Sequence, residues 1–278
     1  MSRQRVAELI PANVQGDNQA ARLDYVTRVS NLFTNPNVAK SIAVGVALTD
    51  TQYADDIAKA VVNLNIATRN NAATIAGAVA NVVPAEEACE IATAMGSLIQ
   101  SGTLKISQAS AIASAIANGA LVKTTPDELQ VVAAQLVVSL MGNYKPVSSL
   151  DPNSPTYKTD LATNQSIVNA VAAVAKSVAQ VSYKYNVVKT LTDDDHVSGF
   201  ANQVAGSAMQ AVLLKPNLNA ATEQPAFALA IMKAVSSVTP TNLGDSAVAF
   251  AVNNVLTHQP VSYAVNCLNE AETPVTNY

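Results

Sequence analysis

The chain is poor in the side chains that build recognition sites for nucleic acids, sugars and metals. Its 278 residues include no Trp, two His, two Cys and only 4% aromatic residues. Base-stacking platforms and aromatic cages therefore lack their main component, and a multi-histidine metal site is not expected. The net charge of −4 provides no overall attraction for phosphate backbones. These absences argue against nucleic-acid binding and make an enzyme with a bulky aromatic core less favoured.

The sequence contains few cysteines, and it shows no pattern typical of a signal peptide or of a membrane-spanning helix. Cys89 and Cys267 are too few for a disulfide framework, and we interpret both as small buried apolar residues. The first residues contain no apolar run typical of a secretory signal, so we expect a cytoplasmic protein, or an extracellular one if a leader was removed. The longest uncharged stretches, 197–214 and 246–269, carry several amide side chains, which predicts no transmembrane segment.

What the chain does contain is a recurring apolar pattern. Hydrophobic residues make up 49% and charged residues 13% of the sequence, a balance typical of a folded protein. Large apolar residues recur at i, i+4 and i+7 or i+8, the spacing of one helix face, and the sets follow one another at about the length of a short helix plus a turn. The clearest sets begin at Ile57, Ile75, Ile91, Ile112, Val132, Ile167, Val181, Val204, Ile231, Val248 and Val261, with a weaker one at Ile42.

Alanines accompany these sets at fixed positions. They stand one and three residues after the leading residue at Ile57, Ile75, Ile91, Ile112 and Val248. On a helix these positions flank the apolar stripe on both sides, which favours close packing against two neighbouring helices. The pattern predicts an all-α fold, a short-helix α-solenoid-like repeat array, with an irregular multi-helix bundle as the alternative.

Composition divides the chain into five predicted parts. Residues 1–34 are expected to form an N-terminal capping segment, and 35–142 a first helical array. Residues 143–160, rich in Pro, Ser and Asn, are interpreted as a loop or hinge. A second helical array is expected over 161–269, and 270–278 reads as a flexible tail.

The densest polar cluster is a weak candidate for a metal site. It places three carboxylates beside an imidazole, but the spacing lacks the alternation and closing Glu of a calcium loop. We interpret it as a helix start, where carboxylates are favoured by the helix dipole, and we interpret the acidic groups at 55–56 and 86–90 in the same way. The candidate metal ligands are Asp193, Asp194, Asp195 and His196; no catalytic residue and no cofactor are predicted.

The last predicted helix, 261–268, carries no charge. A terminal helix of a helical array normally presents a polar outer face, so this helix is a candidate contact surface for another copy or for the N-terminal segment. The candidate interaction residues are Val261, Tyr263, Cys267 and Leu268.

Three functions remain open at the level of sequence. The favoured one is a non-enzymatic structural protein that assembles with itself into a filament, layer or shell, and so forms a homo-oligomer or polymer. The alternative is an adaptor that binds a protein or peptide partner in a groove. An enzyme or small-ligand carrier, for which the 193–196 cluster would be the candidate, is the least favoured.

Overall fold

The computed structural model is all-helical. It describes residues 19–31, 35–121, 129–188, 194–238 and 242–257, without the side chains of 184–188, 194–200 and 242–247. These residues form twelve α-helices and three short 3₁₀ turns, and within them there is no β-strand. The prediction of an all-α fold is confirmed.

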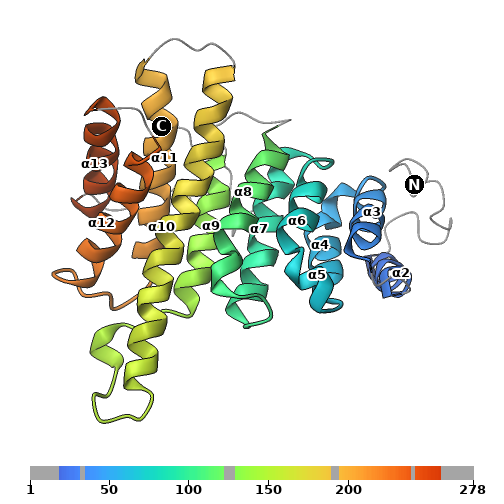
Figure 1. The fold of residues 1–278 in the computed structure, drawn as a ribbon, viewed down its shortest axis with the longest axis horizontal. Coiled ribbons are helices and arrows are strands. Elements are labelled where there is room, and N and C mark those ends of the chain that lie inside the picture. Colours follow the sequence, from blue (N-terminus) through green and yellow to red (C-terminus); the bar gives the residue numbers. More distant parts are fainter. Residues whose placement is uncertain (1–18, 32–34, 122–128, 189–193, 239–241, 258–278) are drawn as a thin grey trace.

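The helices alternate between two layers along one row. Each helix packs against the helix two places further along the chain, if the short α5 and its successor α6 are taken as one place. In Figure 1 the row runs from α2 at the right to α13 at the left. One layer holds α2 (Gln19–Asn31), α4 (Ala54–Asn63), α7 (Ala85–Gln100), α9 (Leu129–Gly142), α11 (Asp194–Leu213) and α13 (Asn242–Thr257). The other holds α3 (Pro36–Ala47), α5 (Ile66–Asn70), α6 (Ala72–Ala80), α8 (Ala109–Ala120), α10 (Tyr157–Val188) and α12 (Glu223–Ser236).

The apolar sets of the sequence form the core between the layers. Each leading residue from Ile57 to Val132 is at most 2% exposed, and Ile167, Ile231 and Val248 are fully buried. Helix ends also follow local signals. Pro36 occupies the first turn of α3, where its missing N–H costs no hydrogen bond. Gly102 follows the end of α7 with φ of 77°, a conformation that residues with a Cβ rarely adopt.

Two elements differ from the sequence-based expectation. The sets beginning at Ile167 and Val181 do not form separate short helices, because α10 continues through both for 32 residues. No Gly or Pro interrupts this stretch, so nothing ends the helix between the two sets. The five-residue helix α5 was not predicted, because it is shorter than one apolar set, which extends from i to i+7 or i+8. Asn65 starts this helix by accepting hydrogen bonds from the backbone of Ala67 and Thr68.

Small residues bring neighbouring helices close together. The alanines that directly follow the leading residues of the first four sets, Ala58, Ala76, Ala92 and Ala113, are completely buried. Helices α6 and α8 approach most closely at two glycines. A Cβ on Gly119 would lie 2.4 Å from the carbonyl oxygen of Gly77 and 2.9 Å from the backbone nitrogen of Asn81. The two backbones are therefore in direct contact here.

The N-terminal end of the row is held by a buried cation. Helix α2 packs on α3 and α4, and Arg22 of α2 is only 3% exposed. Its guanidinium forms an ion pair with Asp50 and lies 5.9 Å from the centre of the Tyr53 ring. The polar α2 is thus fixed to the rest of the row by charge and by an aromatic face.

The two cysteines were both expected to be small buried apolar residues. Cys89 on α7 is buried, at 4% exposure, as predicted, but it is disulfide-bonded, which the interpretation did not include. Cys267 lies outside the described residues. None of the helices over the described ranges combines the length and the apolar character needed to cross a membrane.

Candidate functional site

The residues predicted to be functional lie mostly beyond what the structure describes. Helix α11 begins at Asp194, which agrees with the interpretation of the acidic cluster as a helix start, but Asp193 and the side chains of Asp194, Asp195 and His196 are outside the described part. Outside it too are the candidate interaction residues Val261, Tyr263, Cys267 and Leu268. Among the residues that are described, no three His, Cys, Asp or Glu side chains are arranged to hold a metal ion.

A carboxylate cluster forms where the first turns of α4 and α7 meet. Asp55 lies in the first turn of α4, and Glu86 and Glu87 lie in the first turn of α7, as the sequence predicted for acidic helix starts. Because α4 packs against α7, the negative charge of Asp55 acts on Glu87. The sequence did not indicate this contact between the two helix starts. The Oε2 atom of Glu87 is buried and accepts no hydrogen bond from any residue that the structure describes.

This environment favours the protonated form of Glu87. Burial is the main cause, and the negative charges of Glu90, Asp55 and Glu86 add to it, so the pKa of Glu87 is raised from 4.5 to about 7. The pKa of Asp55 is also raised, chiefly by burial and also by neighbouring Asp56, although Lys59 acts in the opposite direction. The cluster therefore binds protons more tightly in the folded chain than in the unfolded one.

The raised pKa of Glu87 predicts a pH-dependent stability. Because the folded state holds the proton more tightly, proton binding by Glu87 contributes to the free energy of unfolding. This contribution is fully present below pH 4.5 and is lost as the pH rises to about 7. Glu87→Gln is expected to raise the free energy of unfolding at pH 8 by roughly 1–2 kcal/mol, a value reduced from the full pKa difference because the side chain is partly exposed. At pH 4 the two proteins should be equally stable.

Urea unfolding at several pH values measures this effect. The matched control is Glu86→Gln, which removes a carboxylate from the same turn at an exposed position. A Glu87→Gln protein that gains no more stability at pH 8 than Glu86→Gln would show that Glu87 does not carry the pH dependence.

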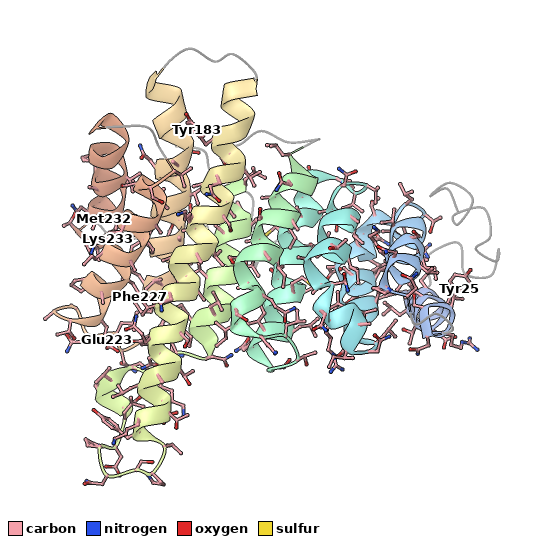
Figure 2. The ribbon with its side chains drawn as sticks, viewed as in Figure 1. Tyr25, Tyr183, Glu223, Phe227, Met232 and Lys233 are labelled. Carbon is pink, nitrogen blue, oxygen red and sulfur yellow. The ribbon has the colours of Figure 1, made fainter. Side chains whose placement is uncertain are left out.

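A second buried carboxylate joins the loop after α9 to the start of α12. Glu223 is 5% exposed and accepts three hydrogen bonds. Its Oε1 accepts from the Tyr144 hydroxyl at 2.8 Å and from the Val147 backbone nitrogen at 2.9 Å, and its Oε2 accepts from the Asn219 backbone nitrogen at 2.8 Å. The Tyr144 ring also packs edge-on against Phe227, with ring centres 5.1 Å apart. Figure 2 shows Glu223 and Phe227 on α12.

This junction is structural in its chemistry. Both carboxylate oxygens of Glu223 accept hydrogen bonds, from two backbone N–H groups and one phenol, and no cation of the described residues is among the partners. Burial and the adjacent Glu223 raise the pKa of Tyr144, so the phenol stays protonated and remains a donor. Asn164 of α10 holds the same loop through two hydrogen bonds to the backbone of Lys145, at 3.0 Å and 2.6 Å.

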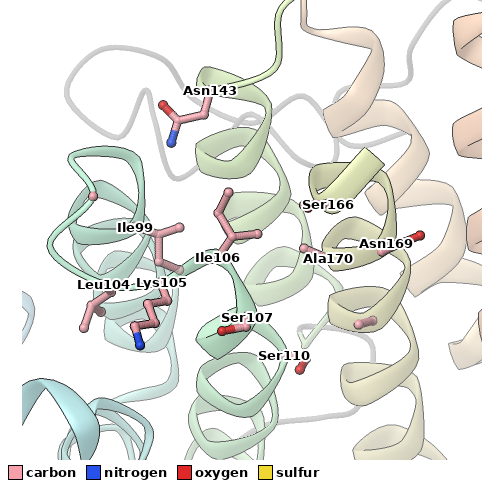
Figure 3. Close-up of a pocket in the computed structure, with 12 residues that line it drawn as sticks. Ile99, Leu104, Lys105, Ile106, Ser107, Ser110, Asn143, Ser166, Asn169 and Ala170 are labelled. Atoms are coloured by element: carbon pink, nitrogen blue, oxygen red, sulfur yellow. The ribbon is translucent and has the colours of Figure 1, made fainter. Parts of the chain in front are cut away.

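The described part of the molecule also contains an open cavity of about 710 Å³, which we call the α8–α10 groove. In Figure 3, Leu104 and Lys105 lie on the side of Ile99 of α7, and Ile106 and Ser107 lie between this side and α10. Its apolar lining consists of Ile99, Leu104, Ile106, Ala170 and Ala173. Its polar lining consists of Lys105, Ser107, Ser110, Asn143, Ser166 and Asn169.

An exposed aromatic side chain lies on α13, the last helix of the described row. Phe250 on α13 is 72% exposed, and α13 contacts its neighbours α11 and α12 through its buried residues Val248 and Val252. Sequence reasoning placed the apolar end surface at 261–268 and missed Phe250, although its aromatic ring stands two residues after the leading Val248, off the apolar stripe.

The chain matches no known protein-family model, and comparison with curated proteins and with solved structures likewise found no match.

Proposed function

We propose that the chain is a non-enzymatic structural protein that assembles with copies of itself, and that its two layers of helices act as a solenoid-like stack whose C-terminal end is a contact surface. The observation that carries the proposal is Phe250, a large apolar side chain 72% exposed on the last described helix of the row. Asn253 and Asn254 on the same helix are exposed and uncharged, so the surroundings of Phe250 add no repulsion between copies.

The architecture supports end-to-end contact. A row of stacked helices has two ends, and a helix at an end lacks the neighbour that covers each inner helix. Burial of one exposed Phe contributes roughly 1.5–3 kcal/mol, which is a weak contact alone but a strong one when repeated between many copies. The low content of charged residues, 13%, leaves little electrostatic opposition to assembly.

Self-association is tested by replacing Phe250. Sedimentation velocity of the full chain over a range of concentrations is expected to show larger species for the wild type and mainly monomer for Phe250→Ser. The matched control is Ile66→Ser, because Ile66 is similarly exposed, at 76%, but lies on α5.

The Ile66→Ser control shows whether a loss of self-association is specific to Phe250. Ile66→Ser is expected to sediment like the wild type. A wild type that is monomeric at every concentration, or a Phe250→Ser protein that associates as strongly as the wild type, would contradict the proposal.

A second candidate, an adaptor that binds a protein partner, is favoured by the α8–α10 groove. Its mixed lining of apolar side chains, uncharged polar side chains and one lysine, in an open cavity of about 710 Å³, is suited to a bound segment of polypeptide.

A further inference from the structure

Of the polar groups that line the α8–α10 groove, Asn143 and Ser166 donate hydrogen bonds to backbone carbonyl groups of the fold, and, among the described residues, the others keep free donors. The Ser107 and Ser110 hydroxyls make no hydrogen bond to any other described residue, and the Lys105 ammonium forms no ion pair in this part of the chain. Asn169 accepts a bond from Gln165 at its Oδ1, which leaves its amide N–H₂ as a donor. The groove therefore presents donors from two sides that have no partner in the described part of the molecule.

The charge of the groove is positive although the chain is acidic overall. Lys105 is the one charged residue among those that line it, and no Asp or Glu is among them. In a chain of net charge −4, this local excess of positive charge favours a negatively charged occupant.

The shape of the groove favours a polypeptide over a small molecule. Pockets for small ligands bury most of the ligand surface. Here Lys105, Ser107, Ser166 and Asn169 are all exposed, so an occupant would keep one side in solvent. The lining beside them is apolar, and on the α10 side Ala170 and Ala173 contribute only methyl groups. An extended chain with small apolar side chains matches that lining.

We propose that the α8–α10 groove binds an extended acidic segment of a protein partner. A carboxylate of the segment pairs with the Lys105 ammonium, and its small apolar side chains lie on Ala170 and Ala173. Backbone carbonyl groups of the segment accept hydrogen bonds from Ser107 and Asn169. The inference deepens the adaptor function named above, and it does not depend on self-association through α13.

The test uses a fluorescein-labelled peptide of sequence AVEAVEA and its neutral counterpart AVQAVQA, titrated by fluorescence anisotropy with the full chain carrying Phe250→Ser, so that self-association through α13 does not contribute. The acidic peptide is expected to bind with a dissociation constant of about 1 mM or lower, and the neutral one at least about fivefold more weakly. Lys105→Glu is expected to weaken binding of the acidic peptide by about tenfold. Ala173→Phe, which fills the α10 side of the groove, should weaken binding of both peptides.

Lys233→Glu is the matched control, because it makes the same change of charge at an exposed lysine on α12. It should alter binding by less than about twofold, a change that reflects net charge alone. No binding of AVEAVEA near 1 mM, equal binding of the two peptides, or equal losses for Lys105→Glu and Lys233→Glu would overturn the proposal. Groove variants in the wild-type background are expected to sediment like the wild type. Peptide binding in the groove and self-association through α13 are therefore tested separately.

Discussion

Replacement of Glu223 by alanine is expected to lower the free energy of unfolding by about 3–4 kcal/mol. The substitution removes the acceptor of three hydrogen bonds, from the Tyr144 hydroxyl and from the backbone nitrogens of Val147 and Asn219. Each donor that is left buried without a partner costs roughly 1–3 kcal/mol. Because Glu223 connects the loop after α9 to α12, the loss should also loosen this part of the row.

Tyr144→Phe separates the contribution of one donor from that of the carboxylate. It removes the 2.8 Å hydrogen bond and keeps the ring that packs on Phe227, so a smaller loss of about 1 kcal/mol is expected. Urea unfolding followed by circular dichroism gives both values. Hydrogen exchange should show faster exchange at the Val147 and Asn219 amides in Glu223→Ala alone. Equal losses for the two variants would mean that Glu223 does not organise the junction.

Gly119→Ala is expected to destabilise the chain by about 3 kcal/mol, although alanine is normally the better helix former. The added Cβ would lie 2.4 Å from the carbonyl oxygen of Gly77, closer than two such atoms approach, and the contact is with backbone that cannot rotate away. Helices α6 and α8 must therefore separate and lose buried contacts along their length.

Gly206→Ala is the matched control on α11. A Cβ at Gly206 meets its nearest neighbours at 3.9 Å, an ordinary contact distance. This substitution should therefore show the usual gain of roughly 0.5–1 kcal/mol for replacing Gly within a helix. Thermal unfolding is expected to show a lower melting temperature than the wild type for Gly119→Ala and a higher one for Gly206→Ala. A Gly119→Ala protein as stable as Gly206→Ala would exclude the direct backbone contact between α6 and α8.

Much of the fold follows from local sequence patterns. The apolar sets predicted nearly every helix of ordinary length, because the spacing of one buried face depends only on helix geometry. The alanines beside these sets predicted close neighbours on both sides of each helix. Ala58, Ala76, Ala92 and Ala113, one residue after the leading residues, are fully buried. Among those three residues after the leading residues, Ala60, Ala78 and Ala115 are only half-buried. The division of the long α10 into two helices was wrong, since periodicity alone does not indicate whether consecutive apolar sets share one helix.

The functional features depend on contacts between distant parts of the chain. Glu223 reads in sequence as an ordinary acidic residue near a helix start, and nothing local indicates its bond to Tyr144, which lies 79 positions earlier. Glu87 was predicted as a helix-start charge, but its raised pKa depends in part on Asp55 of another helix. The α8–α10 groove likewise exists only because α7, α8 and α10 converge.

The most direct test of self-assembly is electron microscopy of the full wild-type chain at low and high concentration. The account predicts single particles at about 1 μM, and rows or larger assemblies of the same particles joined at their ends at about 100 μM. Separate single particles at both concentrations would contradict the proposal that this helical row is built to join copies of itself.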